Sequence, residues 1–203
     1  AYRLTLKGVE VGYGEAYPGM FLAINPGRVL GELAGTPTQD PAFGLPSVWI
    51  ESDQRERAQA YGYTVVDAST VVATHLSNII QTHAAELLGR EETQALLDRV
   101  GREAPRLVEK LVPDLLPLGT VQKVLQNLLD EGVHIRDMRT IIEVLADQGA
   151  KNPDPDALTS IVRVALGRAI IQQIYPGAAE LQVVALDPQL ENILMQATRA
   201  QVP

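Results

Sequence analysis

The chain has 203 residues, of which 46% are hydrophobic and 21% charged, as in a globular protein of one large or several small domains. Its 25 acidic and 17 basic residues give a net charge of −8, which repels phosphate backbones and anionic lipid headgroups. Cysteine is absent, which excludes disulfides, thiolate catalysis and cysteine-based zinc sites.

The first forty residues predict extended structure and loops. Residues 3–11 alternate polar and apolar side chains, as a half-buried strand does, and residues 20–24 are a short apolar strand candidate. Residues 25–42 hold three prolines and three glycines and are expected to be mostly loop. This glycine-bearing stretch lacks the Gly-Lys-Ser/Thr ending of a nucleotide-binding loop.

Strand and helix signals then alternate up to residue 88. Residues 47–51 predict a strand, residues 55–61 a short helix ended by Gly62, and residues 63–66 another strand. Either Asp67 or Ser69 can cap the long helix that follows and that Gly89 ends. Its expected buried stripe consists of Val72, Leu76, Ile79, Ile80, Leu87 and Leu88.

From residue 91 onward the sequence predicts one helix after another. Asp137 and Asp154 are placed to cap two of these helices, and the last stripe predicts a single helix that stops at Pro176-Gly177. The apolar stripes span residues 93–100, 107–112, 121–129, 138–145 and 158–174.

A strand signal returns near the end of the sequence. Residues 181–186 predict a strand, and residues 188–200 predict a helix with Leu190, Ile193, Leu194 and Ala197 inward. A strand followed by a helix suggests that a new small α/β domain begins near residue 176.

Patterns of catalytic or metal-binding residues are weak. His75 and His83 lie eight residues apart, which separates them too far along a helix for one metal ion. No serine lies in a Gly-x-Ser-x-Gly elbow. The sequence therefore gives no positive evidence for an enzyme, a cofactor or a metal site, and an enzyme of unknown type stays only as a rival class.

Two further residues of the helical part bear on nucleic-acid binding. Arg136 and Arg139 follow a turn at Gly132, so this part could pass for a helix-turn-helix regulator. Acidic residues are interspersed and the chain is acidic, which favours a helical interaction domain without nucleic acid.

Phe43 is the main candidate for a binding residue. It lies in a proline- and glycine-bearing loop near Trp49. On the sequence alone a core plug and an exposed anchor are equally good interpretations of this phenylalanine.

A series of short motifs runs through nearly the whole chain in order. They occupy residues 40–50, 62–67, 71–76, 84–92, 105–113, 124–129 and 135–143. These motifs, which include Asp-Pro-Ala-Phe-Gly-Leu-Pro and Val-Val-Ala-Thr-His-Leu, resemble the FHIPEP family. Its members are the large export-gate proteins of flagellar and injectisome type III secretion. The Asp-Pro-Ala-Phe segment is closer to the flagellar branch, with an injectisome homologue as the alternative.

The resemblance implies a docking role. In flagellar members, export chaperones that carry late substrates bind an apolar depression between the first two cytoplasmic subdomains. The docking motif of the family falls on Asp40, Phe43 and Thr74. Phe43 would supply an apolar anchor, while Asp40 and Thr74 would hydrogen-bond a partner helix. The flanking residues are expected to be Val66, Val71, Ile24 and Pro26.

The resemblance also implies an α+β architecture in which small α/β units surround a central helical domain. The expected parts are an incomplete first subdomain (1–20 and 68–88), an inserted α/β subdomain (21–67), a helical subdomain (89–175) and the start of a truncated α/β subdomain (176–203). The chain would be a soluble fragment of a larger region on the cytoplasmic side of the inner membrane. The family further implies other export-apparatus partners and a nonameric ring.

Overall fold

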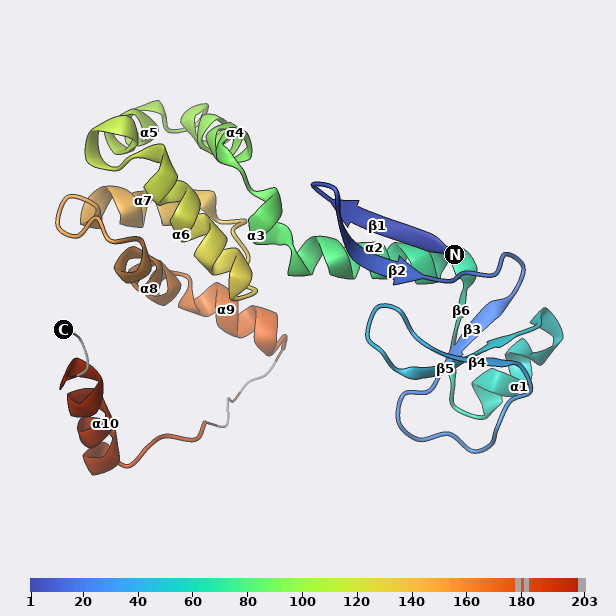
Figure 1. The fold of residues 1–203 in the computed structure, drawn as a ribbon. Coiled ribbons are helices and arrows are strands. Elements are labelled where there is room, and N and C mark those ends of the chain that lie inside the picture. The colour runs from blue at the N-terminus through green and yellow to red at the C-terminus, as the bar shows by residue number, and fades with distance from the viewer. Residues whose placement is uncertain (178–179, 181–182, 201–203) are drawn as a thin grey trace. The chain divides into compact units, whose positions relative to one another are not determined.

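A computed structural model describes residues 1–177, 180 and 183–200 (Figure 1). The chain divides into two compact units, residues 1–165 and 166–203, and each is described by itself. Within the described residues every strand precedes residue 68, whereas residues 90–165 fold as successive helices. The predicted α+β class is confirmed.

The first elements form a two-stranded antiparallel hairpin of β1 (Tyr2–Leu6) and β2 (Val9–Gly14). The single strand predicted over residues 3–11 is therefore wrong. The chain reverses at Lys7 and Gly8, whose φ angles of 50° and 83° are those of a tight two-residue hairpin turn. Lysine rarely adopts positive φ, so the turn signal at this position is weak.

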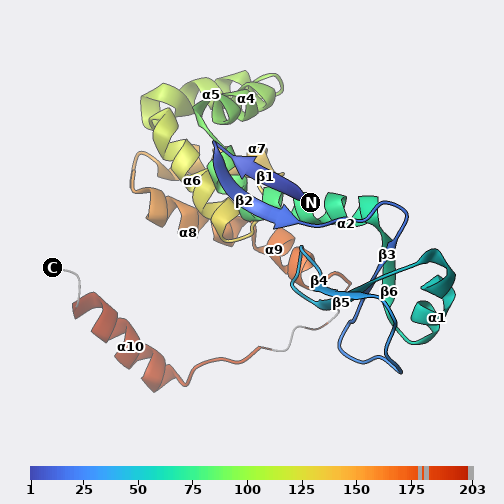
Figure 2. The same ribbon diagram turned by 45° about the vertical axis from the view of Figure 1, so that its right-hand side comes forward.

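A four-stranded antiparallel sheet follows, in the order β4-β5-β3-β6 (Figure 2). Its strands are β3 (Phe21–Ile24), β4 (Thr36–Gln39), β5 (Pro46–Ile50) and β6 (Thr64–Asp67). β4 lies inside the region expected to be mostly loop. It is an edge strand, where Pro37 is tolerated. A 3₁₀ turn (Ser52–Gln54) and α1 (Arg55–Ala60) join β5 to β6.

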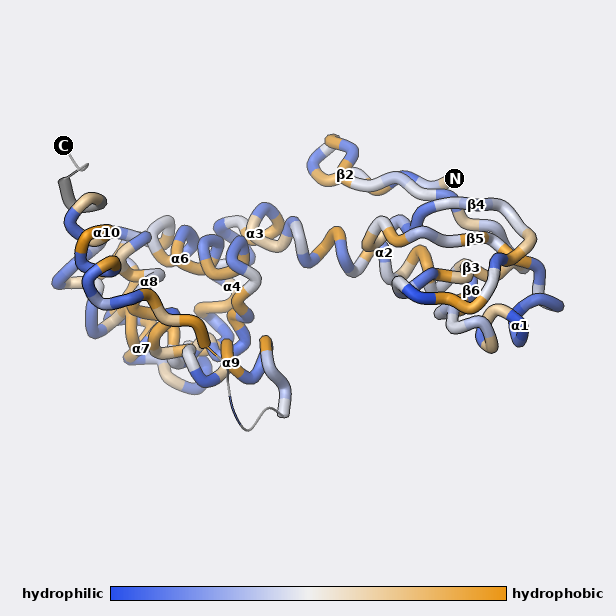
Figure 3. The backbone as a smooth tube through the Cα atoms, turned by 90° about the horizontal axis from the view of Figure 1, so that it is seen from below, coloured by the Kyte–Doolittle hydropathy of each residue, from blue (hydrophilic) through white to orange (hydrophobic). Residues whose placement is uncertain are grey.

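The sheet buries both of its faces, because alternate residues of each strand point to opposite sides. On one face Leu22 and Trp49 pack with Val71 of the next helix, and on the other Ala23 and Ile50 pack with Ala58 of α1. The hydrophobic sequence of β3 and β6 is visible in Figure 3.

The helix α2 (Ala68–Thr82) is capped by Asp67, whose carboxylate accepts a hydrogen bond from the backbone N–H of Thr70. Its buried residues are Val71, His75 and Ile79, whereas Leu76 and Ile80 are exposed. The predicted stripe is therefore only partly confirmed. Ile79 and Leu88 are buried, but Leu87 is exposed, and Val71 and His75 take the buried places expected for Val72 and Leu76. The helix also ends earlier, and α3 (Ala84–Leu87) is separate.

A bundle of helices completes the first unit. Its elements are α4 (Arg90–Gly101), α5 (Pro105–Glu109), an irregular turn (Lys110–Leu115), α6 (Leu118–Asp130), α7 (Met138–Gln148) and α8 (Pro155–Ala165). The predicted stripes of α6 and α7 are confirmed, and Asp137 caps α7. Asp154 accepts from the N–H of Ala157 at the start of α8. The fully buried core includes Leu97, Leu125, Leu128, Ile141, Ile142, Leu145 and Leu158.

The second unit contains α9 (Gly167–Ile174) and α10 (Pro188–Ala200). The single helix expected over 158–174 is wrong, because Leu166, with ψ near 2°, separates α8 from α9, and Gly167 is a weak helix former. Residues 181 and 182 of the expected strand lie outside the described residues, and residues 183–186 form no strand. The helix predicted at 188–200 is confirmed, yet Leu190, Ile193 and Leu194, expected to point inward, are exposed.

Candidate functional site

Phe43 lies on the loop that joins β4 to β5, and its side chain is 66% exposed. The loop is held by the preceding Asp40: Oδ2 of its carboxylate accepts from the N–H of Phe43 at 2.7 Å. Two backbone bonds of 2.8 Å close the same turn, Gly44 N to Asp40 O and Asp40 N to Leu45 O. Gly44 has a φ of 69°, a conformation that glycine adopts without strain.

Helix α2 supports this loop from the side. The side-chain amide of Asn78 donates to the carbonyl oxygen of Ala42 at 3.0 Å, directly beside Phe43. Between loop and helix lies an open depression of about 440 Å³, hereafter the Phe43 depression. It is lined by Phe43, Thr70, Ala73, Thr74, Ser77, Asn78 and Gln81. The surface thus combines one aromatic side chain with a polar helix face.

The structure brings two of the predicted site residues together at this depression, Phe43 and Thr74. Asp40 is only 4% exposed, and within the chain it fixes the conformation of the Phe43 loop. The hydrogen bond expected between Asp40 and a partner helix stays a prediction.

The four flanking residues lie at different depths. Val71 belongs to the core beneath the sheet, with 2% exposure, and Val66 and Ile24 pack partly buried against that core. Pro26 is exposed in the loop after β3. These residues are not among those that line the depression.

Sequence reasoning missed five lining residues, Thr70, Ala73, Ser77, Asn78 and Gln81. Helical spacing from Thr74 would have identified most of these residues. Residues three, four and seven positions away share one side of a helix, which selects Thr70, Ser77, Asn78 and Gln81.

A second hollow, of about 540 Å³, lies on the other side of the Asp40 loop and is lined in part by Tyr13, Glu15 and Trp49. The hydroxyls of Tyr17 and Tyr13 donate to Glu15 at 2.8 and 3.2 Å. These hydrogen bonds, that of Tyr17 above all, lower the pKa of Glu15. A carboxylate with a lowered pKa is a weaker general base near neutral pH.

His75 in α2 and His83 in the turn after it are both engaged within the chain. His75 is buried, and its Nδ1 lies 2.8 Å from the hydroxyl of Tyr2, which ties the hairpin to α2. Burial, followed by the charge of Asp40, raises the pKa of Tyr2, so its hydroxyl stays protonated. His83 Nδ1 lies 3.0 Å from Glu86 Oε1. Both histidines are therefore explained by packing.

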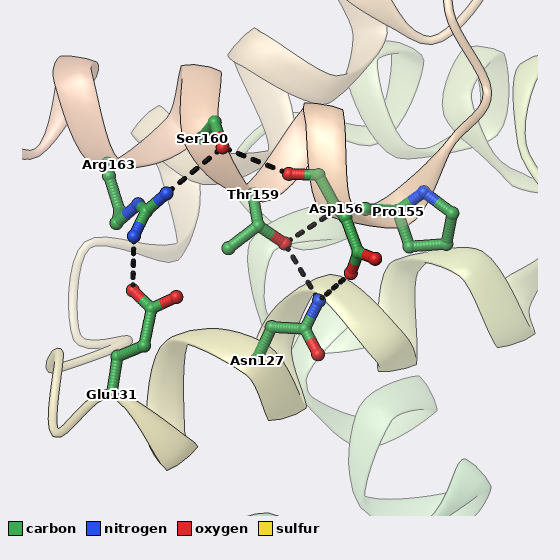
Figure 4. A network of polar contacts seen from close by, with 7 residues as sticks. All are labelled: Asn127, Glu131, Pro155, Asp156, Thr159, Ser160 and Arg163. Atoms are coloured by element: carbon green, nitrogen blue, oxygen red, sulfur yellow. Dashed lines mark hydrogen bonds and ion pairs between the residues drawn. The ribbon is translucent and has the colours of Figure 1, made fainter. Parts of the chain in front are cut away.

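A cluster of polar side chains joins α6 to α8 (Figure 4). Asn127 donates to Asp156 at 2.9 Å and to Thr159 at 3.2 Å, and Arg163 pairs with Glu131 at 3.0 Å. Because these groups satisfy one another across two helices, the cluster has the character of a structural crosslink.

Metal-binding clusters and membrane-spanning helices are both absent from the described part of the chain. It contains no group of three or more His, Asp or Glu side chains that could hold a metal ion. Its helices are too short or too polar to span a membrane.

Comparison with known proteins gives consistent matches. The FHIPEP family matches over residues 1–202. The flagellar biosynthesis protein FlhA of Escherichia coli K12 is 61% identical over 196 residues, which are 97% of this chain and 28% of that protein. The chain therefore spans little more than a quarter of that relative.

Two solved structures carry the same fold. The CdsV protein of Chlamydia pneumoniae is 27% identical with a TM-score of 0.77, covering 94% of this chain and 54% of that one. The nonameric EscV cytosolic domain from a type III secretion system is 28% identical with a TM-score of 0.59, covering 77% and 47%. The sequence match along nearly its whole length, supported by these folds, shows that the chain belongs to the FHIPEP family.

Proposed function

We propose that this chain is part of a docking platform in the flagellar type III protein export apparatus. Export chaperones with bound late substrates would bind at the Phe43 depression, and the platform would order their delivery to the export gate. The observation that carries this proposal is the exposed Phe43 on a loop held by Asp40 and Asn78. A rigidly presented aromatic side chain is the usual anchor of a protein interface.

The polar lining of the depression suits a helical partner. Thr70, Thr74, Ser77 and Gln81 offer donors and acceptors along one side of α2. A partner helix could place an apolar side chain against Phe43 and satisfy its polar groups along α2. Because the depression is open and modest in size, affinity would come from a few such anchors.

The relatives favour the flagellar branch over the injectisome alternative. Identity is 61% to the E. coli flagellar protein but 27% and 28% to CdsV and EscV. By analogy with the nonameric EscV domain, the whole protein would assemble into a nonameric ring, on the cytoplasmic side of the inner membrane, with other export-apparatus components. A catalytic step and nucleic-acid binding form no part of this proposal.

The test is a calorimetric titration of a purified flagellar chaperone–substrate pair into the chain and its Thr74→Met variant. The longer side chain should overfill the depression and weaken binding about tenfold or more, with the melting temperature unchanged. Thr5→Met, the same change on the exposed face of β1, is the matched control and should bind normally. Equal binding by both variants would argue against docking at this depression.

A further inference from the structure

A second opening, hereafter the α4–α7 groove, lies in the helical region and shares no lining residue with the Phe43 depression. It has a volume of about 590 Å³. Its walls come from α4, the last turn of α6, the link from α6 to α7 and the first residues of α7. This volume is within the range of ordinary ligand pockets.

The apolar part of the groove is substantial. Met138 is nearly buried, and the other four apolar lining residues are half-buried. Leu96 and Val100 are one helical turn apart and form a ridge along α4. Apolar surface that stays in contact with water favours association with an apolar partner. The apolar lining residues are Leu96, Val100, Leu129, Ile135 and Met138.

The rim of the groove is basic, although the chain carries a net charge of −8. Within the described residues, the exposed Arg99 and Arg136 make no ion pair, whereas Arg139 pairs with Glu143 at 3.0 Å. The carboxylate of Asp137 is occupied by the backbone N–H and hydroxyl of Thr140, at 3.1 and 2.7 Å. The lining therefore carries three guanidinium groups against the two carboxylates of Glu103 and Asp137, which leaves one excess positive charge beside the apolar strip.

We propose that the α4–α7 groove docks an acidic amphipathic helix of a partner protein. Apolar side chains at positions i, i+4 and i+7 of that helix would lie against the strip, and its flanking carboxylates would reach Arg99 and Arg136. An apolar floor that lacks Phe, Tyr and Trp, together with Glu103 on the rim, fits a protein helix better than nucleic acid. This interaction is separate from chaperone docking and does not depend on it.

The probe is a synthetic helical peptide of about 14 residues with leucine at every third or fourth position and glutamate on its flanks. Fluorescence polarisation against the full chain at physiological salt should show saturable binding. The variant peptide with lysine in place of glutamate should bind more weakly, by about tenfold or more. Backbone amide shifts should map the glutamate peptide to α4 and the α6–α7 link.

Two double variants separate a specific site from general attraction. Arg99→Ala with Arg136→Ala should weaken the glutamate peptide about tenfold or more. The control, Arg102→Ala with Arg106→Ala, removes the same charge from exposed arginines outside the groove and should bind normally. A melt of each variant verifies folding.

Three results would each overturn the proposal. The first is no saturable binding of the glutamate peptide up to about 1 mM. The second is equal binding of the glutamate and lysine peptides. The third is an equal loss of peptide affinity in both double variants, or backbone amide shifts that map outside α4 and the α6–α7 link.

Discussion

The strand-bearing region and the helical region handle large apolar side chains in opposite ways. Within the described residues, nine exposed large hydrophobic side chains lie between residues 1 and 88, but only two between 90 and 165. The helical region buries its leucines and isoleucines and uses polar groups such as Asn127 to join helices. The strand-bearing region uses polar groups such as Asp40 and Asn78 to hold an exposed phenylalanine in place. Similar hydrogen bonds therefore support core packing in the helical region and hold an exposed side chain in place in the strand-bearing region.

The largest loss of stability is expected when a core side chain of the helical region is truncated. Leu125→Ala removes a fully buried side chain from α6 and should lower the free energy of unfolding by about 2–5 kcal/mol. Leu30→Ala, at a residue that is 84% exposed, should change it by less than about 0.5 kcal/mol. Denaturant titration of both proteins measures the difference. Similar losses of unfolding free energy in the two variants would contradict the different burial of these two leucines.

An intermediate effect is expected at the Phe43 loop. Asp40→Ala leaves the N–H of Phe43 without its acceptor and should lower stability by about 1–3 kcal/mol. Hydrogen exchange at the Phe43 amide should accelerate. Asp40→Asn keeps an acceptor oxygen and should largely preserve protection. Unchanged exchange in Asp40→Ala would show that the loop is held by other contacts.

A smaller effect is expected at the crosslink between α6 and α8. Asn127→Ala should lower the free energy of unfolding by about 1 kcal/mol, because two hydrogen bonds to α8 are lost. Combined with Asp156→Ala, the loss should be less than the sum of the single losses, since both variants break the same bond. Strict additivity would contradict the crosslink.

The smallest expected effect is the pH dependence of stability that arises from the Asp67 cap of α2. Hydrogen bonds from the hydroxyl of Ser69 and the N–H of Thr70 lower the pKa of Asp67. Ionised Asp67 therefore stabilises the folded state fully above the ordinary aspartate pKa, near 3.9, and this stability is lost as pH falls through the lowered pKa. Wild type should exceed Asp67→Ala in stability at neutral pH, and the gap should narrow in acid. A constant gap would argue against a charged cap.

Secondary structure was predictable wherever a single physical signal dominated. Asp67, Asp137 and Asp154 marked helix starts, and the stripes of α6 and α7 fixed their buried faces. Errors arose where two arrangements share one pattern. Paired valines and isoleucines left the buried face of α2 ambiguous, and Lys7 gave no sign of the hairpin turn.

The candidate site was only partly predictable. The family motif joins Phe43 and Thr74 although they are distant in sequence, and both line the same depression. The orientation of the Asp40 carboxylate toward its own loop depends on a turn closed by Gly44, and no residue pattern shows which atoms face inward. Asn78 likewise acts across a separation of 36 residues.

The most direct test of the docking account is Phe43→Ala, measured by calorimetric titration with a chaperone–substrate pair and by thermal melting of the same sample. If Phe43 is the anchor, the binding free energy should fall by about 2 kcal/mol or more, roughly thirtyfold in affinity, with the melting temperature nearly unchanged. Leu30→Ala, another exposed apolar side chain on the same region, should bind normally. Normal affinity in well-folded Phe43→Ala protein would contradict the account, and a melting temperature several degrees lower would show that Phe43 is a core residue.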